Sequence, residues 1–204
     1  VGQGACAYLR CRWGGVARFP GGSRLSSHTT ALRNAPCSEE PGFYSSVGLW
    51  LYGNLRVLHG RLAYVANSLG TPEFGSRHLM EIEAEAERLV LAGFTLVCGI
   101  HNEAQQRVAV VPLRWGSPRV LVLSGGFKHH LGPELNEEPF RIARLWRYAW
   151  DRCTDLAISR RAPNKLPTFA RHNPTVDRLI AEIAEKRRPG LCSPFDSLTP
   201  ILRT

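Results

Sequence analysis

Basic side chains gather in two segments of the sequence that contain no acidic residue, residues 124–133 and residues 160–173. Each segment follows a short apolar run, which predicts a loop at the end of a buried strand. Cations without neighbouring acids are suited to holding phosphate groups, although loops also carry charge because they face water. The two segments therefore predict an anion-binding site. Its cations are Lys128, Arg160, Arg161, Lys165 and Arg171.

The sequence lacks several motifs of catalysis and metal binding. It has no GxxxxGK[ST] loop, no GxGxxG after the first predicted strand, no GxSxG elbow and no HExxH site. Its six cysteines include no CxxC pair, which is a poor pattern for a zinc site or a disulfide framework. His101 and Glu103 could form an acid–base pair, but a glutamate that opens a helix more often stabilises free N–H groups. We therefore expect binding without catalysis, metal or cofactor.

The composition is typical of a single globular domain with a polyanionic partner. The 204 residues are 44% hydrophobic, and 26 Lys and Arg against 17 Asp and Glu give a net charge of +9. No run approaches the roughly 18–20 apolar residues that cross a bilayer. The first residues lack the pattern of a signal peptide. We expect a cytoplasmic protein without a membrane partner.

Short apolar runs alternate with helical patterns between residues 46 and 188. The runs that predict strands are 62–66, 94–98, 119–123 and 154–159. The patterns that predict helices are 76–91, 102–115, 134–150 with a break at Pro139, and a last helix opened by Asn173 and Pro174. The alternation predicts a Rossmann-like three-layer α/β domain with a mostly parallel sheet. Residues 1–45 are expected to form an irregular basic arm and residues 189–204 a C-terminal tail.

The carboxyl ends of the parallel strands form the expected binding edge, because helix N-termini offer free N–H groups there. The loops at this edge are residues 67–73, 99–103, 124–133 and 160–173. His101 follows a buried strand and either lines the site or is a core histidine. The aromatic side chains near the end of the third predicted helix either stack on bases or belong to the core. These are Trp146, Tyr148 and Trp150.

Several segments resemble, in the same order, the motifs of the DNA-processing protein A family (DprA, or Smf). Residues 91–99 (LAGFTLVCG) are similar to the family's AGFTVVSG, and residues 169–173 (FARHN) to its FxxRNR. The other similar segments are 51–55 (LYGNL), 62–66, 71–75 (TPEFG) and 120–126. The resemblance covers about residues 49–184. It implies a Rossmann-like fold of the superfamily that also contains the Lonely Guy phosphoribohydrolases, and it implies single-stranded DNA binding and loading of RecA without a known catalytic step.

The sequence departs from the family where DNA contact is implied. The family's Gly-Ser-Arg is replaced by residues 66–68 (ANS), so an arginine is lost. Its Ala-Arg-Gly-Ile-Asp run becomes residues 101–105 (HNEAQ). The strand that the family has after the last helix is replaced by residues 185–188 and a tail. We interpret the chain as a divergent member whose fold is better supported than its DNA-loading role.

Our hypothesis is a DprA-like protein that binds single-stranded DNA or a nucleotide at the carboxyl edge of its sheet. Cations contact phosphate, glycines let the ligand approach the backbone, and Asn173 fixes the last loop or the ligand. The candidate binding residues are Asn67, Ser68, Gly99, His101, Gly125, Gly126, Lys128, Arg160, Arg161, Arg171 and Asn173. The candidate protein partners are a RecA-type recombinase and a second copy of the chain. The alternatives are a nucleotide sensor and a Lonely Guy-like phosphoribohydrolase, although residues 124–127 (SGGF) lack that enzyme's following Thr-x-x-Glu.

Overall fold

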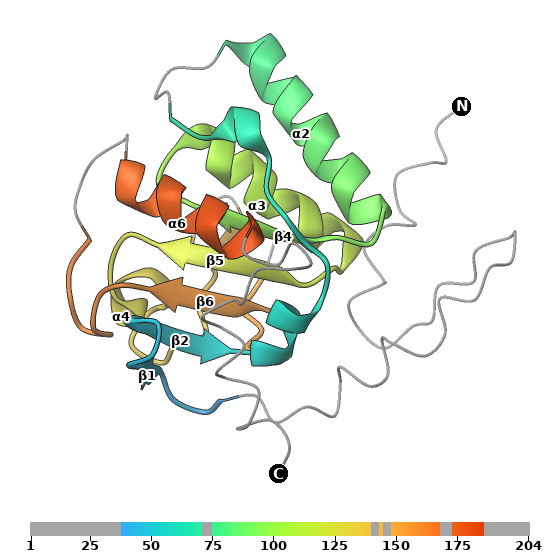
Figure 1. Cartoon of the computed structure of the whole chain (residues 1–204). Coiled ribbons are helices and arrows are strands. Elements are labelled where there is room, and N and C mark those ends of the chain that lie inside the picture. The colour runs from blue at the N-terminus through green and yellow to red at the C-terminus, as the bar shows by residue number, and fades with distance from the viewer. Residues whose placement is uncertain (1–37, 71–74, 140–142, 145–147, 168–172, 186–204) are drawn as a thin grey trace, which may run out of the picture. The chain divides into compact units, whose positions relative to one another are not determined.

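The computed structural model describes residues 38–70, 75–139, 143–144, 148–167 and 173–185, which build a six-stranded sheet with helices on both faces (Figure 1). The strands are β1 (Gly42–Tyr44), β2 (Leu49–Gly53), β3 (Leu62–Ala63), β4 (Thr95–Gly99), β5 (Arg119–Leu123) and β6 (Leu156–Ser159). The α-helices are α2 (Ser76–Leu91), α3 (Glu103–Trp115), α4 (Phe127–Leu131) and α6 (Pro174–Glu185). Two 3-10 helices, η1 (Leu55–His59) and η2 (Ala66–Ser68), flank β3.

The sheet has the order β1-β2-β6-β5-β4-β3. Strands β3 to β6 run parallel, whereas β1 and β2 are antiparallel additions beside β6. Parallel neighbours need crossover connections, and α2, α3 and the segment that includes α4 supply them. The expected Rossmann-like, mostly parallel α/β fold is confirmed.

Alternate side chains of the central strands enter two hydrophobic cores. On β4, Leu96 packs in the core shared with α2 and α3, whereas Val97 packs in the core shared with α6. On β5, Leu121 and Val122 divide in the same way. Because successive side chains of a strand point to opposite faces, both faces of the sheet are buried, which gives three layers.

Helices α2 and α3 have the bounds that their sequence signals predict. The apolar face of α2 is buried on the sheet, and the chain then turns at Gly93 with a φ of 80°. The Asn102 side chain caps α3 by accepting the N–H of Gln105 at 2.8 Å. Gly116, at a φ of 63°, ends α3 in the left-handed conformation that favours glycine.

The predicted helix over residues 134–150 is wrong for residues 134–139 and 148–150, whereas residues 143–144 are helical. Helix α4 stands before this range, and the chain leaves it through positive φ angles of 77° at Gly132 and 54° at Leu135. Such angles are incompatible with a right-handed helix. Glu137 then forms an isolated antiparallel bridge with Ala149.

A buried ion cluster explains why the helical pattern fails there. Arg119, at the start of β5, is completely buried, and its guanidinium donates to Asp155 at 3.0 Å and to Glu138 at 2.7 Å. A third bond reaches the carbonyl of Ala109 at 3.0 Å. A buried cation must be paired, so the sheet draws Glu138 inward. This long-range requirement overrides the local preference for helix.

The strand predictions need two smaller corrections. The run 62–66 is a strand only over β3, because η2 begins at Ala66. Strands β1 and β2 were not predicted, and β1 lies within the range expected to be an irregular arm. The remainder of that range up to residue 37, and the expected tail 189–204, lie outside the described residues.

Candidate functional site

The carboxyl ends of β4, β5 and β6 meet at one edge of the sheet. In the strand register Gly99 pairs with Val122, and Leu123 pairs with Ser159. The segments that leave these strands are therefore neighbours. We call residues 66–70 and 99–105 with Asp177 the β4 end. We call residues 124–131 and 160–167 the β5–β6 end.

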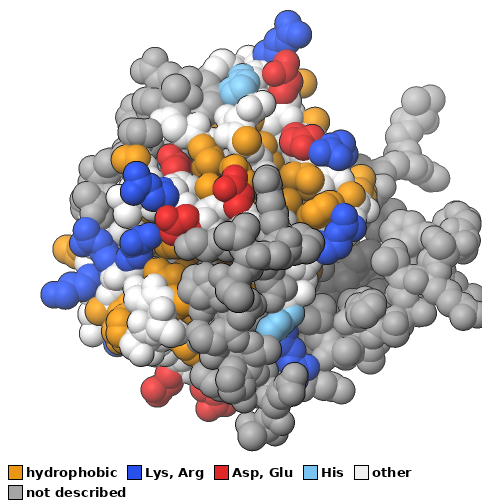
Figure 2. Space-filling view, in the orientation of Figure 1, with side chains coloured by type: hydrophobic (Ala, Val, Ile, Leu, Met, Phe, Trp, Pro, Cys, Tyr) orange, Lys and Arg blue, Asp and Glu red, His pale blue; other side chains and the backbone are white. Residues whose placement is uncertain are grey.

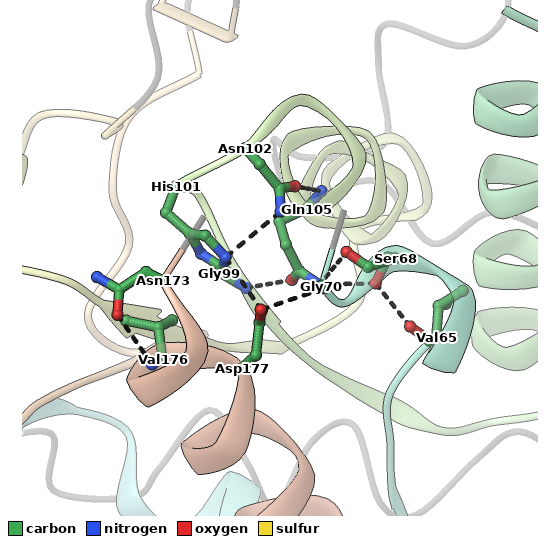
Figure 3. Close-up of polar contacts among 10 residues, drawn as sticks. All are labelled: Val65, Ser68, Gly70, Gly99, His101, Asn102, Gln105, Asn173, Val176 and Asp177. Atoms are coloured by element: carbon green, nitrogen blue, oxygen red, sulfur yellow. Dashed lines mark hydrogen bonds and ion pairs between the residues drawn. The ribbon is translucent and has the colours of Figure 1, made fainter. Parts of the chain in front are cut away.

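At the β4 end, the side chain of Gln105 joins three segments of the chain (Figure 3). The Gly99 N–H donates to Gln105 Oε1 at 2.6 Å. The Gln105 amide nitrogen donates to Ser68 at both the carbonyl, 3.2 Å away, and Oγ, 2.6 Å away. Ser68 and Gln105 are each only 1% exposed. The Gly99 N–H, the Gln105 side-chain amide and Ser68 are therefore hydrogen-bonded to one another inside the protein.

His101 and Asp177 extend this buried network (Figure 3). The Nε2 atom of His101 lies 3.0 Å from Oδ1 of Asp177 in helix α6, and both side chains are more than nine-tenths buried. The other carboxylate oxygen of Asp177 accepts the N–H of Gly70 at 3.2 Å. His101 Nδ1 is buried without a hydrogen-bond partner among the described residues. His101 thus has the position of a core histidine that links the strand end to α6.

Asn67 and Asn173, the candidate binding residues beside this network, have different surroundings. Asn67 is exposed, and its carbonyl oxygen lies 3.3 Å from a ring nitrogen of His78 in α2. Asn173 caps α6, because its side-chain oxygen accepts the N–H of Val176 at 3.3 Å. Glu103 opens α3 and lies 3.7 Å from Arg107, one turn along the same helix. The cap at Asn173 matches the predicted opening of the last helix.

At the β5–β6 end, residues 160–167 lie directly on the glycine segment, and we call them the strap. The Gly126 N–H donates to the Lys165 carbonyl at 2.7 Å, and the Lys128 N–H donates to the Pro163 carbonyl at 3.0 Å. A Cβ atom on Gly126 would stand 2.3 Å from the Pro163 oxygen, and one on Gly125 would stand 2.7 Å from the Pro167 nitrogen. The expectation that these glycines admit a ligand stays a prediction. The backbone that approaches them is the chain's own strap.

Hydrogen bonds within the β5–β6 end hold the strap in this position. The Ser159 hydroxyl donates to the Gly125 carbonyl at 2.8 Å and accepts the N–H of Arg161 at 2.9 Å. The Arg161 guanidinium donates to the Leu166 carbonyl at 3.3 Å. The Lys165 N–H donates to the Ala162 carbonyl at 2.9 Å and closes a turn. Hydrogen bonds thus hold the strap backbone, and its exposed side chains are Arg160, Arg161, Asn164, Lys165 and Leu166.

Cations cover the outer surface of the β5–β6 end. Lys128 and Lys165 are exposed, and among the described residues neither is paired with a carboxylate. Arg160 is half-exposed and lies 3.7 Å from Glu182 of α6. Figure 2 shows Lys and Arg side chains gathered at the left, where Figure 1 places the strap and the start of α6. We call this surface the basic edge and define it by Lys128, Arg160, Arg161 and Lys165.

The structure adds one cation that the sequence analysis did not consider. Arg178 is exposed on α6, one helical turn before Glu182, which faces Arg160. The sequence feature that could have identified Arg178 is its position on the polar face of the last predicted helix. The predicted phosphate ligand Arg171 lies outside the described residues.

Helix α4 contains a histidine, His130, whose pKa is lowered. Burial, assisted by the neighbouring His129, lowers the pKa of His130 to about 4. The two rings meet edge to face with centroids 5.0 Å apart. His130 is therefore neutral at physiological pH and adds no charge to the basic edge.

The aromatic residues expected either to stack on bases or to lie in the core are placed in the core where they are described. Trp150 is 5% exposed and lies 5.9 Å from the guanidinium of Arg119. Tyr148 is partly buried against the same core. Trp146 lies outside the described residues.

None of the helices in the described residues combines the length and the apolar character needed to cross a membrane. In the same residues, no three His, Cys, Asp or Glu side chains are grouped closely enough to hold a metal ion.

Comparison with known proteins yields a fold likeness. No protein-family model matches the chain, and no curated protein matches it significantly. A solved structure that is similar is the X-ray structure of DNA processing protein A (DprA) from Streptococcus pneumoniae. The identity is 17%, the TM-score is 0.48, and the match covers 75% of this chain and 51% of that chain. This chain spans about half the length of that structure, and the likeness does not assign it to a family.

Proposed function

We propose that this domain binds single-stranded DNA along the basic edge, through contacts with phosphates and without a catalytic step. The observation that carries the proposal is the set of exposed cations on a strap with a fixed backbone. Residues 124–133 and 160–173 contain no acidic residue, and Glu182 of α6 lies 3.7 Å from Arg160. A row of cations on a surface suits a strand of phosphates, which supplies several charges at once. The motif resemblance to the DNA-processing protein A family supports the same class of ligand.

The strap also favours a polymer over a mononucleotide. The Gly126 and Lys128 N–H groups, which could hold a single phosphate at the start of α4, already donate to carbonyls of the strap. A phosphate placed there would meet the oxygens of Ala162 and Pro163, which crowd Gly126. The side chains of the cations instead face the solvent on the outer surface of the β5–β6 end. An extended anion can contact them without displacing the strap.

The experiment is a titration of a fluorescent oligothymidylate at several salt concentrations, followed by fluorescence anisotropy. The edge variant Lys128→Ala/Lys165→Ala is compared with the control Arg77→Ala/Arg88→Ala on α2. Both remove two positive charges, and the control residues lie in exposed ion pairs that contribute little to stability. Two lost phosphate contacts reduce the slope of log affinity against log salt by about 1.4. Equal slopes in the two variants, or binding of the wild type that salt does not weaken, would contradict the proposal.

Further assays of the same samples separate the alternatives. Release of free base from a nucleoside monophosphate would indicate a phosphoribohydrolase, and tight binding of a mononucleotide with weak binding of DNA would indicate a sensor. A RecA-type recombinase and a second copy of the chain stay predictions as partners. Pull-down with a purified recombinase and sedimentation of the protein alone test them.

A further inference from the structure

A large apolar side chain stands exposed in the middle of the basic edge. Leu166 is 66% exposed and follows Lys165 directly in the strap. Its own carbonyl accepts a hydrogen bond from the guanidinium of Arg161 at 3.3 Å. Among the described residues, Leu166 therefore lies next to two cations of the basic edge, Lys165 and Arg161.

The backbone on both sides of Leu166 is held in place. On one side, the Lys165 carbonyl accepts the Gly126 N–H at 2.7 Å. On the other side, Pro167 packs so closely on Gly125 that an added Cβ would stand 2.7 to 2.9 Å from three of its atoms. A residue fixed in this way presents its side chain to the solvent at a defined position. Since burial of a leucine is favourable, this exposure leaves an apolar contact available to a ligand.

We propose that Leu166 packs against an unstacked base of the bound strand while the neighbouring cations hold its phosphates. This inference rests on the proposed function and adds to it the part of the ligand that is recognised. A single strand offers anionic phosphates and apolar base faces within one short stretch. A duplex hides its base faces by stacking. Leu166 thus gives the edge its preference for single strands, and the cations give it affinity.

The test uses three probes with matched numbers of phosphates: an oligothymidylate, the same strand made of abasic units, and a duplex. The wild type is expected to bind the oligothymidylate about fivefold more tightly than the abasic strand. Leu166→Ala is expected to bind the two strands equally, with the salt dependence of the wild type retained. Leu91→Ala is the matched control, because Leu91 is 62% exposed on α2. This control keeps the preference for bases.

A spectroscopic variant gives a second readout of the same contact. The Trp fluorescence of Leu166→Trp is expected to fall on addition of oligothymidylate and to stay constant with the abasic strand. Equal binding of both strands by the wild type, together with salt-sensitive affinity, would overturn the role of Leu166 and leave the proposed function intact. Absence of salt-sensitive binding to any strand would overturn the proposed function itself. Saturable binding to anionic lipid vesicles that Leu166→Ala abolishes would replace the base with a lipid as the apolar partner.

Discussion

The β4 end and the β5–β6 end occupy equivalent places at the carboxyl edge of one sheet, yet they use their polar groups differently. At the β4 end, Ser68, Gln105 and Asp177 are buried and bond to one another's segments. At the β5–β6 end, the side chains of Lys128 and Lys165 are exposed, and strap carbonyls accept the backbone N–H groups of Gly126 and Lys128. The rule that ligands bind at the carboxyl edge identifies both ends. The two ends differ in whether their polar groups are hydrogen-bonded inside the protein or face the solvent, and this difference leads us to propose the β5–β6 end as the binding site.

The glycines of the two ends, in contrast, have the same kind of surroundings. Gly99 packs against His101, since an added Cβ would stand 2.6 Å from the ring nitrogen Nδ1. Gly126 packs against strap carbonyls. Both residues admit parts of the same chain. A glycine-rich loop at this edge therefore does not by itself indicate a phosphate site.

The largest expected effect comes from forcing the strap off the β5–β6 end. Gly126→Ala places a Cβ 2.3 Å from the backbone oxygen of Pro163. Because this oxygen belongs to the backbone, the clash is relieved only if the strap moves. We expect the free energy of unfolding to fall by roughly 3 kcal/mol, measured by urea denaturation. DNA affinity should fall as well, because the cations lose their fixed spacing.

Gly75→Ala is the matched control for this change. An added Cβ at Gly75 meets no described atom within 4 Å, and its φ of −65° suits any residue. We expect a change below about 0.5 kcal/mol. Equal stability of the two glycine variants would show that the strap is not fixed on the glycine segment.

The next largest effect concerns the β4 end. Gln105→Ala removes three hydrogen bonds and leaves the Gly99 N–H and Ser68 without their buried partner. The expected loss in the free energy of unfolding is about 2 to 3 kcal/mol. The control Gln106→Ala removes a single bond to the Ile100 carbonyl and should cost about 1 kcal/mol.

DNA binding distinguishes the two ends in the same variant. Oligothymidylate affinity of Gln105→Ala, measured well below its melting temperature, should equal that of the wild type. A loss of affinity as large as that of the Lys128→Ala/Lys165→Ala variant would place the ligand at the β4 end.

A smaller effect follows from the titration of His130 in α4. Burial lowers the pKa of His130 to about 4, whereas the unfolded chain binds a proton near the ordinary value of about 6.5. The unfolded state therefore gains protons first, and stability falls as the pH drops from 6.5 toward 4. His130→Leu should reduce this fall by on the order of 2 kcal/mol, measured as unfolding free energy across that range. An identical pH dependence of the wild type and His130→Leu would contradict the burial of His130.

The smallest effect tests whether the β4 end is closed in solution. Burial raises the pKa of the Cys98 thiol to about 12, and its sulfur lies 3.8 Å from the Val120 carbonyl. Cys153 is exposed. Iodoacetamide should modify Cys153 in the native protein and leave Cys98 intact, as read by peptide mass spectrometry. Modification of Cys98 at a comparable rate would show that the β4 end opens.

The regular elements could be predicted from the sequence where local signals decide them. The bounds of α2 and α3 follow from one apolar face, the cap at Asn102 and the glycines at 93 and 116. Residues 134–139 of the predicted helix over 134–150 are not helical, because Arg119 needs Glu138 from a distant segment. Strand β1 escaped prediction because it has only three residues, and β2 because it pairs antiparallel with the distant β6 outside the strand–helix alternation. No local sequence pattern indicates the pairing of Arg119 with Glu138 or the antiparallel pairing of β1 and β2.

The positions of the exposed cations could be predicted from the sequence, and the surroundings of the other candidate residues only in part. The acid-free segments correctly mark the loops that carry exposed cations. That Ser68 and His101 turn inward depends on Gln105 and Asp177, which come from other elements. The strap over Gly126 is a tertiary contact between segments about forty residues apart, so the glycines alone suggested an open loop.

Photochemical cross-linking tests the central claim most directly. An oligothymidylate that contains 4-thiothymidine is bound to the wild-type protein, irradiated and digested, and the modified peptides are mapped by mass spectrometry. The account predicts cross-links within residues 127–131 and 160–167, at the β5–β6 end. Cross-links confined to residues 66–70 and 99–105 would contradict it and place the strand at the β4 end.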